Sequence, residues 1–181
     1  MRILLLNDHI PPEGKGGAES VVWRLAHGLH SAGHDVHVAA TTPQSAFEEH
    51  REGIPTYHLH ATYPDRWRAW LSLINPQTMT PFHHLLDRLQ PDVINAHNIH
   101  FYFSYHVLKI AHQHHIPTVF SAHDVMPFAY TKLSHFVRPD GWGVTSPQDY
   151  RLPFGYNLMH NRFRYNPLRN LIIRYYLNKY A

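Results

Sequence analysis

Arg2-Ile3-Leu4-Leu5-Leu6-Asn7 is a short apolar run near the start of the chain, and Gly14-Lys15-Gly16-Gly17-Ala18-Glu19 follows it after a brief gap. The apolar run is typical of a buried β-strand. Because glycine has no Cβ, Gly16-Gly17 allow a sharp turn at which a ligand can approach the main chain. Apolar residues then recur at helical spacing: Val21, Val22, Leu25, Ala26 and Leu29. We therefore predict a strand, a glycine-rich turn and a helix over 18–32, the unit with which many α/β proteins hold a phosphate or a sugar. An ordinary tight turn with nothing bound is the alternative.

The glycine-rich turn departs from two well-known phosphate-binding motifs. A P-loop has Ser or Thr directly after its Gly-Lys pair, whereas Gly16 follows Lys15 here. A dinucleotide-binding fingerprint has an acidic residue at the end of the second strand. The predicted second strand, residues 34–40, continues instead into Thr41-Thr42-Pro43. Ordinary ATP or NAD binding is therefore not expected.

The rest of the chain alternates between strand-like and helix-like segments. Strands are predicted over residues 34–40, 56–60, 92–97 and 117–122, and helices over 82–89 and 102–115. Residues 61–75 are rich in aromatic side chains and lack a clear period, which predicts an irregular surface flap. This alternation predicts a Rossmann-like, three-layer α/β domain with a mainly parallel sheet. A chain of 181 residues suffices for one such core.

Polar residues follow several of the predicted strands at the point where each strand ends. Asp8-His9 follow the first strand, His97-Asn98 the fourth, and His123-Asp124 the fifth. The carboxyl ends of parallel strands meet at one edge of a sheet, which is where open α/β sheets bind ligands. We therefore expect these residues and the Gly16-Gly17 turn to form one site.

Cysteine and histidine usage constrains the chemistry. The chain contains no cysteine, which excludes disulfide bonds and thiolate metal sites. Its 19 histidines are spread over different predicted elements without a His-Glu-x-x-His pattern, so no specific metal site is expected. No apolar segment approaches the length of a membrane span, and no cleavage pattern follows the apolar start. We expect a cytoplasmic protein without a metal cofactor.

The net charge of +3 is unevenly distributed along the chain. Residues 151–181 contain six basic residues and no acidic residue, so this segment carries +6 and the remainder carries −3. A basic, aromatic segment of this kind predicts peripheral contact with an anionic membrane at its inner face. The other interpretation, which we favour for most of these residues, is a helix whose arginines face water. Nucleic acid is not expected as a partner, because no nucleic-acid-binding motif or base-stacking platform accompanies the charge.

In combination these segments resemble the N-terminal, acceptor-side domain of the retaining family 4 glycosyltransferases, which have the GT-B fold. The resemblance rests on the Gly-Gly-Ala-Glu turn and on Leu-Ala-His-Gly-Leu-His-Ser-Ala-Gly-His-Asp-Val-His-Val in residues 25–38. It continues with Pro-Asp-Val-Ile-Asn-Ala-His-Asn in 91–98 and Ile-Pro-Thr-Val-Phe-Ser-Ala-His-Asp in 116–124. By this resemblance, residues 1–150 form the domain and residues 151–181 a basic amphipathic helical segment at its end.

The resemblance implies transfer of a sugar from a nucleotide-sugar donor to a glycan or lipid-linked acceptor, with retention at the anomeric carbon and without a metal. It implies that His123 lies against the transferred sugar as the catalytic residue. It places Gly16 and Gly17 beside the donor diphosphate or the acceptor. The acceptor pocket would be bordered by His97, Asn98 and Asp124. Asn95 stands where many relatives carry histidine, which leaves its contribution open.

The resemblance covers one of the two domains of a GT-B enzyme. A C-terminal, donor-binding domain is absent from the sequence, so we expect an N-terminal half that is inactive alone. Two alternatives remain open. One is a non-catalytic module that binds a glycan or a lipid head group, and the other is the acceptor subunit of a two-chain transferase.

Overall fold

The computed structural model describes residues 1–12, 14, 16–123 and 167–181. The strands are β1 (Arg2–Leu6), β2 (Asp35–Thr42), β3 (Phe47–Arg51), β4 (Ile54–His60), β5 (Val93–Ala96) and β6 (Thr118–Phe120). The helices are α1 (Gly17–Ser31), the 3₁₀ helix η1 (Asp65–Trp67), α2 (Arg68–Leu71), α3 (Pro76–Leu89), α4 (His106–Gln113) and α6 (Pro167–Tyr180).

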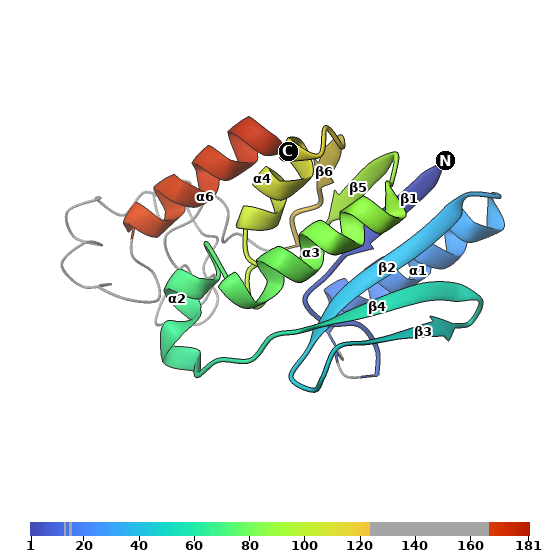
Figure 1. Cartoon of the computed structure of the whole chain (residues 1–181), viewed down its shortest axis with the longest axis horizontal. Helices are drawn as coiled ribbons and strands as arrows, with labels where there is room; N and C mark the ends of the chain where they lie inside the picture. Colours follow the sequence, from blue (N-terminus) through green and yellow to red (C-terminus); the bar gives the residue numbers. More distant parts are fainter. Residues whose placement is uncertain (13, 15, 124–166) are drawn as a thin grey trace, which may run out of the picture.

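The strands join one sheet in the order β3-β4-β2-β1-β5-β6 (Figure 1). Central β1 pairs in parallel with β2 on one side and with β5 on the other. β4 and β6 extend the parallel arrangement, and β3 runs antiparallel to β4. The predicted mainly parallel sheet is confirmed. The carboxyl ends of β1, β2, β4, β5 and β6 consequently lie at the same edge of the sheet.

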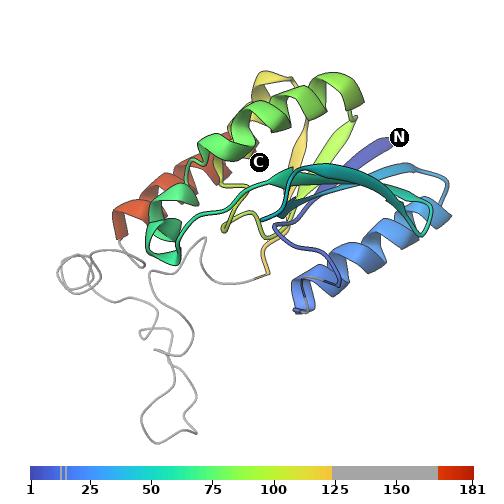
Figure 2. The same ribbon diagram turned by 60° about the horizontal axis from the view of Figure 1, so that its bottom comes forward.

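Helices cover both faces of the sheet, which gives the predicted three layers. Figure 2 shows α1 on one side of the sheet and α3 on the other. Because side chains alternate along a strand, Ile3 and Leu5 of β1 enter the core beneath α1, whereas Leu4 and Leu6 enter the core shared by α3 and α4. α6 packs beside α4 and contributes Ile173 to this second core.

Helix α1 forms close to its predicted bounds but buries a narrower stripe than expected. Val22 and Ala26 are fully buried, and Leu25 and Leu29 pack partly against them. Val21 is 48% exposed, so its predicted packing role is wrong. The helix ends at Ser31, and Gly33 follows with a φ of +84°, a conformation that glycine adopts without strain.

Residues 61–75 do not form the predicted flap. They fold into η1 and α2, with Ala69, Ser72 and Leu73 buried. Arg169 of α6 fastens the segment, because its guanidinium donates to the Ala69 carbonyl oxygen at 2.8 Å and to Ser72 Oγ at 2.9 Å. Arg169 is itself 2% exposed, whereas Arg174 of the same helix is exposed, so one of the two described arginines of this helix faces water and the other does not.

Two further differences concern the start of α4 and an edge strand. α4 begins at His106 rather than at residue 102, because the preceding backbone N–H groups bond to a buried carboxylate described below. β3 was not predicted from the sequence, since its polar residues lie exposed at the edge of the sheet.

Among the described residues, none of the helices combines the length and apolar content that crossing a membrane requires.

Candidate functional site

The candidate site begins where β1 and β5 end, at two asparagines that join their loops. Asn7 is fully buried, and its Oδ1 accepts a hydrogen bond from the backbone N–H of Asn98 at 3.0 Å. The backbone N–H of Asp8 donates in return to the Asn98 carbonyl oxygen at 2.7 Å. These two bonds hold the exits of neighbouring strands together, so the residues that follow start from fixed positions.

Asp8 organises the loop that follows β5. Its buried carboxylate accepts the backbone N–H groups of Phe101, Tyr102 and Phe103 at 2.6, 2.9 and 2.7 Å. Burial raises the pKa of the Asp8 carboxyl, while His100 and the three N–H donors favour its charged form. The sequence marked Asp8 as a polar strand end but gave no sign of this role, since its partners lie more than 90 residues away.

His97 and His123 form a hydrogen-bonded pair at the carboxyl ends of β5 and β6. His97 Nδ1 lies 2.7 Å from His123 Nε2, and the two rings stack with their centroids 5.0 Å apart. His97 is 2% exposed, whereas His123 is exposed. Burial, together with His123, lowers the pKa of His97 to about 4. His97 is therefore neutral at pH 7.

The glycine-rich turn lies against the same loop through His9. A Cβ on Gly14 would meet the Cγ of Glu19 at 2.5 Å and the Cβ of His9 at 2.9 Å. The His9 ring in turn contacts the rings of Phe101 and Tyr102. Gly16 is the N-cap of α1, and a Cβ there would collide with the Glu19 carboxylate. An anion at this helix end would therefore meet the negative charge of Glu19 as well as the favourable helix dipole.

The structure thus brings together some of the predicted site residues. His97 contacts His123, and Asn98 bonds to Asn7. Within the described part of the chain, no recorded contact joins Gly16 or Gly17 to the histidine pair. Asp124 lies outside the described residues, as do Lys15 and the part of the basic segment that precedes α6, residues 151–166.

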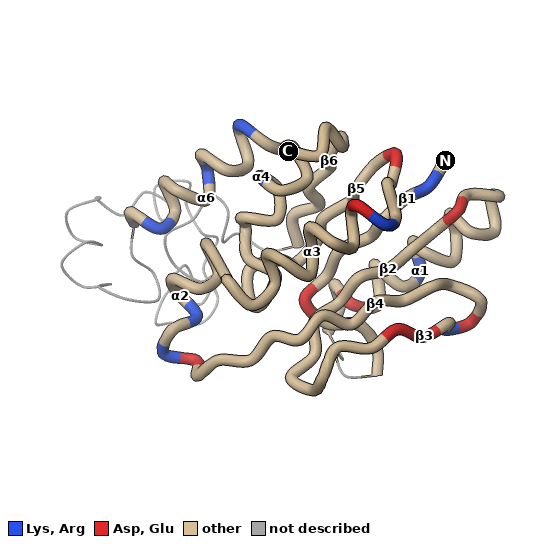
Figure 3. The backbone as a smooth tube through the Cα atoms, viewed as in Figure 1, with Lys and Arg blue, Asp and Glu red and all other residues tan. Residues whose placement is uncertain are grey.

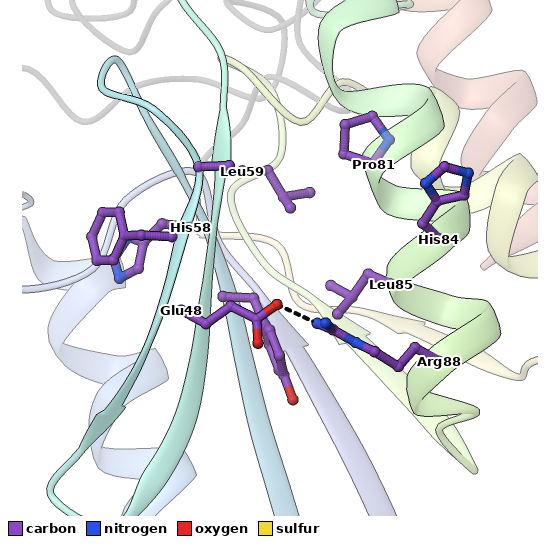
Figure 4. Close-up of a pocket in the computed structure, with 10 residues that line it drawn as sticks. Glu48, His58, Leu59, Pro81, His84, Leu85 and Arg88 are labelled. Atoms are coloured by element: carbon purple, nitrogen blue, oxygen red, sulfur yellow. Dashed lines mark hydrogen bonds and ion pairs between the residues drawn. The ribbon is translucent and has the colours of Figure 1, made fainter.

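A pocket of about 330 Å³ lies elsewhere, between α3 and the β3–β4 hairpin (Figure 4). Its lining includes Tyr57, Leu59 and Leu85, and the Glu48–Arg88 ion pair spans it at 2.5 Å. These residues come from β3, β4 and α3, and the lining includes none of the candidate-site residues, so the pocket is separate from the candidate site. Its two charged groups are paired with each other. In the described ranges, no three His, Asp or Glu side chains are grouped so that they could hold a metal ion.

A family model and solved structures match parts of this chain. Residues 15–178 match the model of Glycosyltransferase Family 4. No match to a curated protein was found. Among solved structures, the chain is similar to SsfS6, a glycosyltransferase of Streptomyces sp. SF2575, with 20% identity and a TM-score of 0.41. The match covers 67% of this chain and 39% of that one, so this chain spans well under two thirds of the length of SsfS6.

Proposed function

Because this chain belongs to Glycosyltransferase Family 4, we propose that it forms the N-terminal, acceptor-side part of a retaining GT-B transferase. In this proposal a sugar passes from a nucleotide-sugar donor to a glycan or lipid-linked acceptor. The observation that carries the proposal is the family match over residues 15–178, combined with the polar groups gathered at the carboxyl edge of the sheet.

The proposed chemistry needs orientation and charge stabilisation rather than an enzyme nucleophile. The bond between the sugar C1 and the donor phosphate oxygen breaks, and a bond from C1 to the acceptor oxygen forms on the same face. The acceptor hydroxyl proton passes to the departing phosphate. In this proposal His123 contacts the transferred sugar, and the turn at Gly16-Gly17 offers backbone N–H groups to the donor or acceptor. No metal is required for these steps.

We expect Asn98 and His97 to border the acceptor pocket. The two residues differ in how far their side chains are exposed. The Asn98 main chain is fixed by Asn7, which leaves its partly exposed side chain at the site edge. His97 is buried and turned toward His123. We assign acceptor contact to Asn98.

We further propose that α6 lies against an anionic membrane surface, which favours a lipid-linked acceptor. Leu171, Ile172 and Tyr175 are 46%, 39% and 53% exposed on this helix, beside the exposed Arg174 and Lys179. Figure 3 shows basic and no acidic residues along α6. Exposed apolar side chains support contact with a membrane or another protein, and the neighbouring cations favour an anionic surface.

Transfer assays test the proposed reaction. Residues 1–181 alone, and the same chain joined to a family 4 donor-binding domain (the completed enzyme), are incubated with radiolabelled nucleotide-sugars and with glycan or polyprenyl-phosphate acceptors. We expect no transfer by the chain alone and transfer with retained anomeric configuration by the completed enzyme. Inverted product would contradict the retaining mechanism. Acceptor binding without transfer by any completed enzyme would favour a non-catalytic binding module instead.

A further inference from the structure

His97 is the buried partner of the histidine pair, and the ring nitrogen that faces away from His123 is buried too. Its Nδ1 lies 2.7 Å from His123 Nε2. Its Nε2 is buried and has no hydrogen-bond partner among the described residues. A nitrogen without solvent exposure cannot reach an acceptor hydroxyl in a cleft. The bond to His123 is therefore the contact through which His97 can act.

The direction of that bond follows from the state of Nε2. Neutral imidazole carries one proton, on either Nδ1 or Nε2. A proton on Nε2 of His97 would create a buried N–H without an acceptor, and such orphaned donors are rarer in proteins than under-satisfied acceptors. The neutral His97 ring therefore carries its proton on Nδ1, and this N–H donates a hydrogen bond to His123 Nε2. The low pKa of His97 agrees with a single proton on this ring.

From this geometry we infer that His97 is a positioning residue that holds His123 in its Nδ1–H tautomer. Because His123 Nε2 accepts a hydrogen bond from His97, this nitrogen is unprotonated, and neutral His123 must carry its own proton on Nδ1. His123 is exposed, so this N–H is the polar group that it can present to a ligand. The site thereby gains a hydrogen-bond donor of fixed position, suited to a hydroxyl or ring oxygen of a sugar.

The identity of the sugar ligand rests on the proposed function, whereas the tautomer of His123 does not. The two can therefore fail separately. A second histidine pair in the same chain provides a matched control. His83 Nδ1 lies 2.9 Å from His114 Nε2, between α3 and α4 and away from the strand ends.

Nitrogen-15 NMR of the full chain with labelled histidine tests the tautomer, because protonated and bare ring nitrogens have well-separated shifts. Signals are assigned by their loss in His97→Asn and His123→Asn. In the wild type we expect protons on His97 Nδ1 and on His123 Nδ1. In His97→Phe, His123 should exchange between both tautomers. In His97→Asn, whose side-chain amide can still donate, it should remain in the Nδ1–H form. A proton on His123 Nε2 in the wild type would overturn the inference.

Kinetics of the completed enzyme provide the second readout. His97→Phe should lower kcat by roughly 10–100-fold with little change in KM, the range typical for partners that orient a functional histidine. His97→Asn should restore most of that loss, and His83→Phe should leave kcat unchanged. If His123→Ala abolishes transfer while His97→Phe does not reduce it, the positioning role is wrong and the proposed function stands. If no completed enzyme transfers sugar, the NMR result alone decides the tautomer.

Discussion

At the scale of single residues, His123 is the side chain on which the proposed reaction depends most. It is exposed beyond the end of β6, and its Nε2 is hydrogen-bonded to Nδ1 of His97. His123→Ala in the completed enzyme should lower turnover by about 10²–10³-fold, the typical cost of removing one positioned polar contact at a reacting centre. His50 is an exposed histidine on β3 and serves as the control. His50→Ala should leave the rate unchanged and alter stability by roughly 0.5 kcal/mol or less. Equal rates for the two variants would remove His123 from the mechanism.

His97 also makes the stability of the chain depend on pH. Its folded-state pKa of about 4 lies below the ordinary value of 6.5, so the folded protein binds this proton less readily than the unfolded chain. Its contribution is fully present above the unfolded pKa and is lost as the pH falls through the folded one. Urea unfolding between pH 7 and pH 4 should therefore show a loss of up to about 3 kcal/mol that His97→Asn removes. An unchanged slope in His97→Asn would contradict the low pKa.

The site residues differ in how far the sequence could identify them. His97 and His123 stand at the ends of predicted strands, and the parallel rule placed those ends at one edge. Their 2.7 Å bond, however, depends on side-chain orientation that no spacing encodes. The role of Asp8 was equally hidden, because two of the three residues whose N–H groups bond to its carboxylate, Tyr102 and Phe103, fall within the helix predicted over 102–115.

At the scale of elements, helices and strands with a clear apolar period could be predicted from the sequence. Elements that form through contacts with the rest of the fold could not. β1, α1, β2 and β5 follow their apolar patterns closely. β3 has little apolar pattern, although the turn before β4 leaves a signal. Glu52 and Gly53 adopt positive φ values of 50° and 84°, as the two central residues of a tight hairpin do. The Glu52-Gly53 pair, which lies between two strand-like runs, could have indicated this hairpin.

The contact between α6 and α2 depends on one buried arginine. Arg169 donates to the Ala69 carbonyl oxygen and to Ser72 Oγ, so Arg169→Met should leave buried acceptors without their donor. The expected loss of unfolding free energy is about 2–3 kcal/mol, measured by urea denaturation. Arg174→Met, on the exposed side of the same helix, should cost roughly 0.5 kcal/mol or less. Similar losses for the two variants would show that Arg169 contributes no more than a surface arginine.

At the scale of the whole molecule, charge is distributed in two unlike regions. Residues 93–123 and 167–181, which form β5, β6, α4 and α6, contain neither Asp nor Glu. The acidic residues of the described chain lie on the first part of the fold, from β1 to the turn before β5 (Figure 3). The cationic region includes α6 with its exposed Leu171, Ile172 and Tyr175. An apolar surface within a carboxylate-free region is suited to an anionic membrane rather than to water.

Vesicle binding measures the affinity of the chain for anionic membranes. The chain should bind vesicles that contain anionic lipid, bind purely zwitterionic vesicles weakly, and dissociate as salt is raised. Each basic residue near an anionic surface is worth about 1 kcal/mol. Replacing Arg174 and Lys179 together by Ala should therefore lower the affinity roughly 30-fold. Arg24→Ala, which removes an exposed arginine from α1 on the opposite face of the sheet, should leave the affinity unchanged. Absence of binding at low salt, or equal effects of the two substitutions, would mean that the apolar surface of α6 serves a contact with protein instead.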